Sequence, residues 1–321
     1  GRRLIVSDLE RRTVNESAPG GQPIRPWAAL WTMVLGFFMI LVDSTIVTVA
    51  TPALRADLDA SYNAVIWVTS AYLLAYVIPL LVTGRLGDRI GPKKVSLTGL
   101  TIFTLASLWC GLTDTIEMLI VARVAQGLGA SMMTPQTMTV VTRTFSPRNR
   151  GRAMSLWGAT AGAAMLVGPV LGGVIVEHIG WQWIFLVNIP VGIIGLILAW
   201  LWVPNLETHS HTFDWLGVFL SLVAVSLLTF GIQEGETYNW GRINQWLSVP
   251  LLLGLGVVFL ALFVFWQSRN KREPLVPLSL FSDRNFAINS TAVAAVSFTV
   301  LAFPFPFMLW AQQAKGWSPA V

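Results

Sequence analysis

The chain has 321 residues, of which 54% are hydrophobic, 12% are charged and 15 are Trp. A soluble domain carries about twice that charged fraction, so the composition excludes an ordinary soluble protein as well as an intrinsically disordered chain. The single Cys excludes a disulfide scaffold and a multi-thiolate zinc site, and the net charge of +5 raises the question of which side of a membrane holds the basic residues.

A polar segment, residues 1–26, opens the chain; it contains five Arg residues and a Pro/Gly-rich stretch, and it predicts a mobile tail outside the membrane. Beyond it, nine apolar stretches reach the roughly 17 to 25 residues that a helix needs to cross the hydrocarbon of a bilayer. Their bounds are 27–50, 64–82, 95–112, 118–141, 153–176, 184–203, 215–232, 247–266 and 286–310. None shows the short alternation of an outer-membrane barrel, and backbone polar groups in lipid must be paired within the protein. The sequence therefore predicts an all-α polytopic membrane protein.

The basic residues between these stretches favour one orientation. If the tail is cytoplasmic, 17 of the 21 Lys and Arg residues lie on that side, three lie on the other side, and Arg123 lies within a span. Basic loops stay preferentially in the cytoplasm, so the N-terminus is predicted to be cytoplasmic. Loop 204–214 is an exception, because it belongs on the basic side and carries Glu207 and Asp214 but no Lys or Arg. The absence of a Ser- and Arg-rich leader favours a bacterial inner membrane.

Two charged residues fall inside the predicted spans. Asp43 lies deep in the first and Arg123 lies about two turns into the fourth. A charge in mid-membrane costs several kcal/mol unless it faces a partner or a wet cavity, so mutual attraction is the simplest arrangement. A carboxylate that exchanges a proton beside a permanently charged guanidinium is the functional interpretation. A static ion pair that fixes helix packing is the alternative.

Small residues gather in the fifth span. Gly158 and Gly162, and again Gly168 and Gly172, have the four-residue spacing that lets a neighbouring helix approach closely. Pro169 removes a backbone donor and bends a helix. Packing alone explains this pattern, and a hinge between moving helices is the sharper hypothesis.

Residues 84–94, GRLGDRIGPKK, join the second and third spans. The glycines around a lone Asp88 predict a tight, charged turn in which Asp88 pairs locally or caps a neighbouring helix. A generic basic loop needs no glycine at these positions, which makes this segment the most specific signal in the chain.

Other candidate sites fall away. His209 and His211 stand in a polar loop without a further Cys or His nearby, so a solvated loop is favoured over a metal site. Cys110 lies in an apolar span, where an inert packing role is expected. The chain has no phosphate-binding glycine loop, no nucleophile elbow and no zinc-protease motif, so neither ATP-driven pumping nor an enzyme is expected.

Several stretches resemble those of a known family. Residues 84–94 resemble the signature between the second and third helices of the major facilitator superfamily, and residues 123–129, RVAQGLG, resemble its fourth-helix signature. Residues 43–52, DSTIVTVATP, look like the first-helix motif of its fourteen-helix drug:proton antiporters, the EmrB/QacA type. Residues 181–192 and 213–217 are similar to the entries to that group's sixth helix and inserted helices.

The resemblance implies roles for individual residues. It makes Asp43, Arg123 and Gln126 the proton-coupling group. It assigns to a cytoplasmic latch the residues Gly84, Asp88, Arg89, Gly91 and Lys93. It assigns to the closing part of the fifth-helix antiporter motif the residues Gly168, Pro169, Gly172 and Gly173.

The resemblance also implies a function. It implies that two six-helix halves rock around a central cavity and export amphipathic or cationic small molecules in exchange for protons, which is multidrug efflux. No cofactor is implied, because the proton gradient drives the cycle. The expected partners are the substrate, protons and membrane lipids, with no nucleic acid, and the protein is expected to be a monomer. Export of a native metabolite or lipid, and a non-transporting receptor or scaffold, remain open alternatives.

The resemblance also predicts the domain organisation. Residues 1–26 form the tail, 27–203 a six-helix bundle, 204–267 two inserted helices, and 268–321 a loop with the first helix of an incomplete second bundle. Nine spans do not complete two six-helix halves, so we expect the chain to be a fragment that needs about five further spans for a transport cycle.

Overall fold

A computed structural model of the chain describes residues 25–208, 214–270 and 274–302. The polar tail and the pair His209 and His211 lie outside the described residues. The chain divides into two compact units, residues 1–263 and 264–321, and each is considered by itself.

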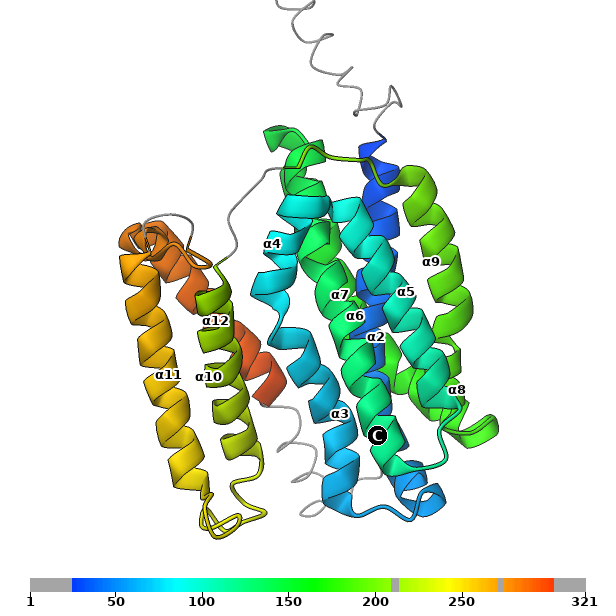
Figure 1. The fold of residues 1–321 in the computed structure, drawn as a ribbon. Helices are drawn as coiled ribbons and strands as arrows, with labels where there is room; N and C mark the ends of the chain where they lie inside the picture. The colour runs from blue at the N-terminus through cyan, green and yellow to red at the C-terminus, as the bar shows by residue number, and fades with distance from the viewer. Residues whose placement is uncertain (1–24, 209–213, 271–273, 303–321) are drawn as a thin grey trace, which may run out of the picture. The chain divides into compact units, whose positions relative to one another are not determined.

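In its described residues, the first unit consists of helices and the segments that connect them (Figure 1). Its helices are α2 Pro26–Asp57, α3 Tyr62–Val77, α4 Leu80–Ile90, α5 Pro92–Gly111, α6 Ile116–Thr144, α7 Pro147–His178, α8 Trp183–Leu186, α9 Asn188–Trp202, α10 Trp215–Gln233 and most of α11 Val249–Arg269. The second unit holds the end of α11, the short 3₁₀ helix η1 Leu278–Ser282 and α12 Arg284–Ala302.

Among the described residues, seven spans are long and apolar enough to cross a membrane, with α8 and α9 forming one of them. The pair α3 and α4 makes an eighth span that is bent by 44°. This confirms the prediction of an all-α polytopic membrane protein. The ninth predicted stretch, 286–310, begins as α12, and its remainder lies outside the described residues.

Local signals account for several helix ends. Ser61 and Thr115 cap α3 and α6, each accepting a hydrogen bond from the backbone N–H three residues later, at 3.2 and 3.3 Å. Asp214 caps α10 in the same way at 2.9 Å. Gly91 separates α4 from α5 with a φ of +100°, a conformation that glycine adopts without steric cost.

Close approach of small residues holds the bundle together. A Cβ on Gly99 of α5 would lie 2.7 Å from the carbonyl oxygen of Gly129 on α6, and a Cβ on Gly129 would lie 2.6 Å from the backbone nitrogen of Phe103. On α9, a Cβ at Gly192 would overlap Thr104 of α5. In lipid the hydrophobic effect does not drive helices together, so such backbone contact supplies much of the packing energy.

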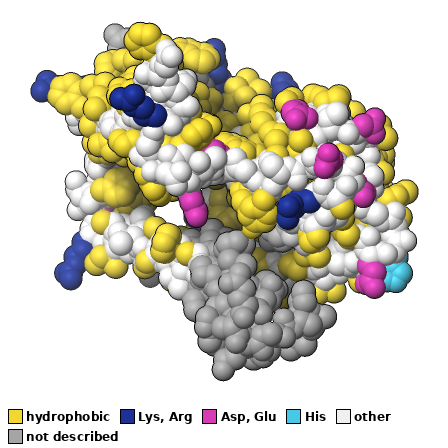
Figure 2. All heavy atoms as spheres, turned by 90° about the horizontal axis from the view of Figure 1, so that it is seen from below, with side chains coloured by type: hydrophobic (Ala, Val, Ile, Leu, Met, Phe, Trp, Pro, Cys, Tyr) yellow, Lys and Arg dark blue, Asp and Glu magenta, His cyan; other side chains and the backbone are white. Residues whose placement is uncertain are grey.

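The two ends of the bundle differ in charge. The junctions α2/α3, α5/α6 and α7/α8 meet at one end, which Figure 2 views directly and where acidic side chains are plainly visible. The exposed acids there are Asp57, Asp59, Asp114, Glu117 and Glu177. The basic segments 85–94 and 143–152 lie at the opposite end. The loop charges on which the predicted orientation rests are therefore separated between the two ends of the bundle, and the orientation itself stays a prediction.

Helices α10 and α11 run side by side as a hairpin (Figure 1). A Cβ on Gly231 of α10 would lie 2.8 Å from Leu253, and one on Gly256 of α11 would lie 2.7 Å from Leu228. Within the second unit, Gln267 accepts a hydrogen bond from the backbone N–H of Val276 at 3.2 Å, and the rings of Phe281 and Phe286 meet edge to face with centroids 5.3 Å apart.

Candidate functional site

The two intramembrane charges meet in the centre of the bundle. The Arg123 Nη1 group of α6 donates to Oδ2 of Asp43 on α2, and both side chains are fully buried. These positions are 80 residues apart in sequence, so only the packing of α2 against α6 brings them together. Each of these charges would carry a large desolvation penalty if it were buried alone, and their direct contact offsets that penalty.

Two amide side chains complete the surroundings of the Asp43 carboxylate. Gln126 Nε2 of α6 and Asn188 Nδ2 of α9 both donate to Asp43 Oδ1 at 2.8 Å. Gln126 also donates to the hydroxyl of Ser107 on α5 at 2.8 Å and accepts from Arg123 Nη1 at 2.6 Å. The carboxylate therefore has donors on both oxygens, as a buried polar group requires.

Arg123 is held from further sides. Its Nε donates to the carbonyl oxygen of Val68 on α3 at 3.0 Å, and its guanidinium lies 4.1 Å from the ring centre of Tyr72 and 5.5 Å from that of Phe185. The Tyr72 hydroxyl in turn donates to the carbonyl of Ile40 on α2 at 3.0 Å. Cation–π contacts of this kind are worth about 2 kcal/mol when they are desolvated. The site therefore ties α2, α3, α5, α6, α8 and α9 to one charged pair.

Asn188 is a member of this group that the sequence did not reveal. It lies in the stretch 181–192 that carries the family resemblance, but it is 145 positions away from Asp43. Its only signal in the sequence is an amide side chain inside an otherwise apolar span. Buried polar groups need partners, so such a residue marks a polar contact without identifying it.

The two glycine pairs of the fifth predicted span, which is part of α7, differ in what they contact. Cβ atoms on Gly168 and Gly172 would collide with Thr45 and Ile46 of α2, so this pair allows α7 to lie against α2. Gly158 and Gly162 have no atom of another described residue within 4 Å of such a Cβ. The spacing prediction of close packing is therefore wrong for Gly158 and Gly162, because that face of α7 has no neighbour among the described residues.

Gly168→Ala is expected to lower the stability of the protein, because the added methyl group forces α7 away from Thr45. An overpacked methyl group typically costs about 1–3 kcal/mol. Gly158→Ala is the matched control on the same helix and should leave stability unchanged or slightly raised, since Ala favours helix. Thermal unfolding in detergent measures both, and equal melting temperatures for the two variants would contradict the packing assignment.

The segment 84–94 is more helical than the sequence predicted. Residues up to Ile90 belong to α4, and the turn is confined to Gly91, so the expectation of a tight turn over the whole segment is wrong. The physical reason is packing against α6: Gly84 lies near Pro135, and Gly87 leaves room for the side chain of Gln136. Gln136 Nε2 then donates to the carbonyl of Thr83 at 2.9 Å.

The charged latch residues lie at the basic end of the bundle. Asp88 accepts from Arg143 Nη2 of α6 at 3.2 Å, with about a third of each side chain exposed, and Arg143 Nη1 donates to the carbonyl of Glu207 at 2.9 Å. Lys93 Nζ donates to the carbonyl of Trp200 at the end of α9 at 2.7 Å. Arg89 is exposed. Asp88 thus pairs with a base 55 residues away, near the C-terminal end of α6, which is neither the local pair nor the helix cap that the sequence predicted.

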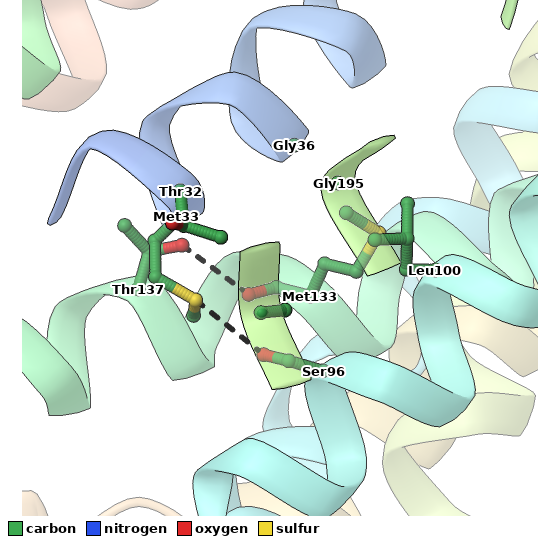
Figure 3. A pocket seen from close by; sticks show the side chains of 9 residues that line it. Thr32, Met33, Gly36, Ser96, Leu100, Met133, Thr137 and Gly195 are labelled. Atoms are coloured by element: carbon green, nitrogen blue, oxygen red, sulfur yellow. Dashed lines mark hydrogen bonds between the residues drawn. The ribbon is translucent and has the colours of Figure 1, made fainter. Parts of the chain in front are cut away.

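A small cavity lies between α2, α5, α6 and α9 (Figure 3). Its lining consists of Thr32, Met33, Gly36, Ser96, Leu100, Met133, Thr137, Gly195 and Ala199. Its volume is about 20 Å³, room for a single water molecule. Figure 3 shows that the nearest hydroxyls are already engaged, Ser96 with the Met33 sulfur at 3.9 Å and Thr137 with the Met133 carbonyl at 3.4 Å. The cavity is too small for a drug-sized substrate.

Several aromatic side chains of the bundle have partners among its other residues. Tyr72 is fully buried against Arg123, Tyr76 donates to Thr134 at 3.1 Å, and Trp157 stacks on Phe37 with ring centres 4.6 Å apart. Trp181 is also buried, and its indole N–H donates to Asp57 at 3.0 Å.

The sequence profile of the Major Facilitator Superfamily matches residues 33–321, which is most of the chain. The chain belongs to the Major Facilitator Superfamily.

Two relatives of this major facilitator chain show how far the similarity extends. It is 51% identical over 294 residues to the uncharacterized MFS-type transporter Rv1250 of Mycobacterium tuberculosis, covering 92% of this chain and 50% of that protein. It is 33% identical over 297 residues to the tetracenomycin C resistance and export protein of Streptomyces glaucescens, covering 92% of this chain and 54% of that protein. The chain thus spans about half the length of these curated relatives.

A solved structure supports the fold of this major facilitator chain. The crystal structure of the peptide transporter POT in complex with sulfate aligns with a TM-score of 0.58 at 13% identity, over 81% of this chain and 56% of that chain. The likeness at this identity concerns the fold. The two relatives are named as an MFS-type transporter and as a resistance and export protein.

Proposed function

We propose that this chain is part of a proton-coupled exporter of amphipathic or cationic small molecules, of the fourteen-helix drug:proton antiporter type. The observation that carries the proposal is the fully buried Asp43–Arg123 pair, with Gln126 and Asn188 on the free carboxylate oxygen. Ionisable residues inside a membrane protein are expensive and mark proton or ion pathways more often than they serve packing.

The chemistry of coupling follows from this geometry. Arg123 remains charged throughout, so a proton taken up by Asp43 removes one half of the ion pair and weakens the attachment of α2 to α6. The proton changes the balance between two conformations only if Asp43 binds it more strongly in one of them. The helices α3, α5, α8 and α9 all contact this group, so its charge state acts on most of the bundle.

Export of drug-like molecules is supported by the relative from Streptomyces glaucescens, whose name describes resistance to and export of tetracenomycin C. The motifs at residues 43–52 and 213–217 support the fourteen-helix type. The accumulation of bases at one end of the bundle supports a cytoplasmic N-terminus in a cell membrane. Protons, membrane lipids and the exported molecule are the partners of this function, the proton gradient takes the place of a cofactor, and a monomer is sufficient.

The test uses the complete protein that contains this sequence, reconstituted in vesicles with an imposed pH gradient. A panel consists of a fluorescent lipophilic cation, tetracenomycin C, a neutral amphiphile and a hydrophilic vitamin. We expect substrate-dependent proton movement with the first two compounds. Proton movement with the vitamin alone would replace drug export by export of a metabolite, and no proton movement with any compound, in vesicles that retain substrate binding, would contradict coupling.

A further inference from the structure

We propose that Asn188 is a positioning residue that stabilises the charged form of Asp43 and links proton binding there to the first turn of α9. This inference rests on the proposed function, because it concerns how Asp43 takes up its proton. It assigns a role to a side chain of α9 whose hydrogen bond to the charged pair, among the described residues, goes to Asp43.

The geometry distinguishes Asn188 from the other two donors. Arg123 and Gln126 both lie on α6, and a hydrogen bond of 2.6 Å joins them, so they form one preassembled unit. Asn188 arrives separately from α9 and donates to Asp43 Oδ1 at 2.8 Å with 4% of its surface exposed. Among the described residues, this hydrogen bond joins α9 directly to the Asp43 carboxylate.

The strength of this hydrogen bond depends on the charge of Asp43. A hydrogen bond to an ionised acceptor is roughly twice as strong as one between neutral groups. Protonation of Asp43 therefore weakens the attachment of Asn188, and removal of Asn188 makes the charged carboxylate less favourable. By the same thermodynamic linkage, a movement of α9 that breaks the contact would favour proton uptake.

The remainder of α9 is held by contacts that do not depend on that proton. Gly192 lies directly against Thr104 of α5, and a Cβ on Gly195 would lie 3.2 Å from Leu100. At the far end, Lys93 donates to the carbonyl of Trp200. The contact of Asn188 with Asp43 thus responds to the proton at one end of α9. The other contacts of this helix are apolar packing and the hydrogen bond from Lys93 to the Trp200 carbonyl.

The groups that face Asp43 do not obscure its titration. In the described part of the bundle they are Arg123 on α6, Tyr72 on α3 and Cys110 on α5. Helix α9 contributes Asn188, and α8 contributes the ring of Phe185 toward Arg123. Tyr and Cys ordinarily ionise above about pH 8 and Arg above about pH 12. A carboxyl group that titrates at lower pH can therefore be followed separately.

The experiment follows the infrared carbonyl band of a protonated carboxyl group as a function of pH, in the complete protein held in lipid nanodiscs. The band that disappears in Asp43→Asn belongs to Asp43. Asn188→Leu keeps the branched shape of the side chain and removes the donor, and Asn188→Ala removes the donor and most of the side chain. We expect both to raise the midpoint of this band by about one pH unit, the effect of one lost hydrogen bond to a charged group.

Gly192→Ala is the structural control, because it disturbs the packing of α9 on α5 one turn away without touching the carboxylate. We expect it to lower the melting temperature and to leave the midpoint unchanged. A midpoint that is the same in wild type and in both Asn188 variants overturns the inference and leaves the proposed function intact. A midpoint that moves as far in Gly192→Ala as in the Asn188 variants also overturns it, since helix displacement then explains the shift. If wild type shows no titrating band that depends on Asp43, both the inference and the proposed coupling fail.

Discussion

Replacing Asp43 with Asn is expected to reduce proton-driven export to the level of vesicles without protein, while the protein still inserts and folds. Asn has almost the same shape as Asp, and its single carbonyl oxygen can accept a hydrogen bond in the place of Oδ2, from Arg123, or of Oδ1, from Gln126 and Asn188. It cannot take up a proton near neutral pH, so the pH gradient loses the group on which it acts. Substrate accumulation driven by a pH gradient, in vesicles of the complete protein, measures the loss.

A second measurement separates loss of coupling from loss of transport. Exchange of labelled for unlabelled substrate needs no net proton movement, and we expect Asp43→Asn to retain it. Asp59→Asn is the matched control: Asp59 is an exposed acid just beyond the same helix with a φ of 47°, a conformation that Asn tolerates. Normal proton-driven accumulation by Asp43→Asn, or an equal loss in Asp59→Asn, would refute the role of Asp43.

Replacing Arg123 with Leu is expected to produce the largest loss of stability among single substitutions at this site. It leaves the Asp43 carboxylate buried without its counter-charge and removes the hydrogen bond to the Val68 carbonyl. Breaking a buried ion pair by removing one partner costs about 3–5 kcal/mol. Unfolding of the purified protein in detergent, followed by heating or by a denaturant, measures the loss.

The double variant Asp43→Asn with Arg123→Leu tests the physical reason. It removes both charges, so we expect it to be more stable than Arg123→Leu alone, with a coupling energy of about 1–3 kcal/mol in the cycle. Arg143→Leu serves as the control for loss of an exposed pair, and its partner Asp88 remains solvated, so its cost should stay below about 1 kcal/mol. Additive effects of the two buried substitutions would contradict an energetic pair.

The covalent sequence determined the membrane character of this protein and the approximate place of its spans. The observed helices α5, α6, α10 and α11 begin and end within a few residues of the predicted stretches, because about twenty consecutive apolar residues have no other stable arrangement in lipid. The segment 84–90 was harder to predict, since its glycines read as a turn. They remain helical because Gly84 and Gly87 pack against Pro135 and Gln136 of α6, which are distant in sequence.

The candidate site was predicted in part. A lone acid and a lone base inside apolar spans are costly, so Asp43 and Arg123 could be identified from their positions alone. Their actual contact, and the choice of Gln126 and Asn188 as the other donors, depended on where α2, α6 and α9 cross. Asn188 carries no charge and costs less to bury, so its sequence context gave no comparable signal.

The same division holds for the glycines of α7. Their four-residue spacing was visible in the sequence, but Gly168 and Gly172 face α2 whereas Gly158 and Gly162 do not face a described neighbour. Hydrophobicity and charge placement are local properties, and they determined which segments enter the membrane and which residues are unusual there. The pairing of donors with acceptors and of glycines with backbones is a property of helix crossings, and only the tertiary structure decided it, because each such contact joins residues tens to hundreds of positions apart.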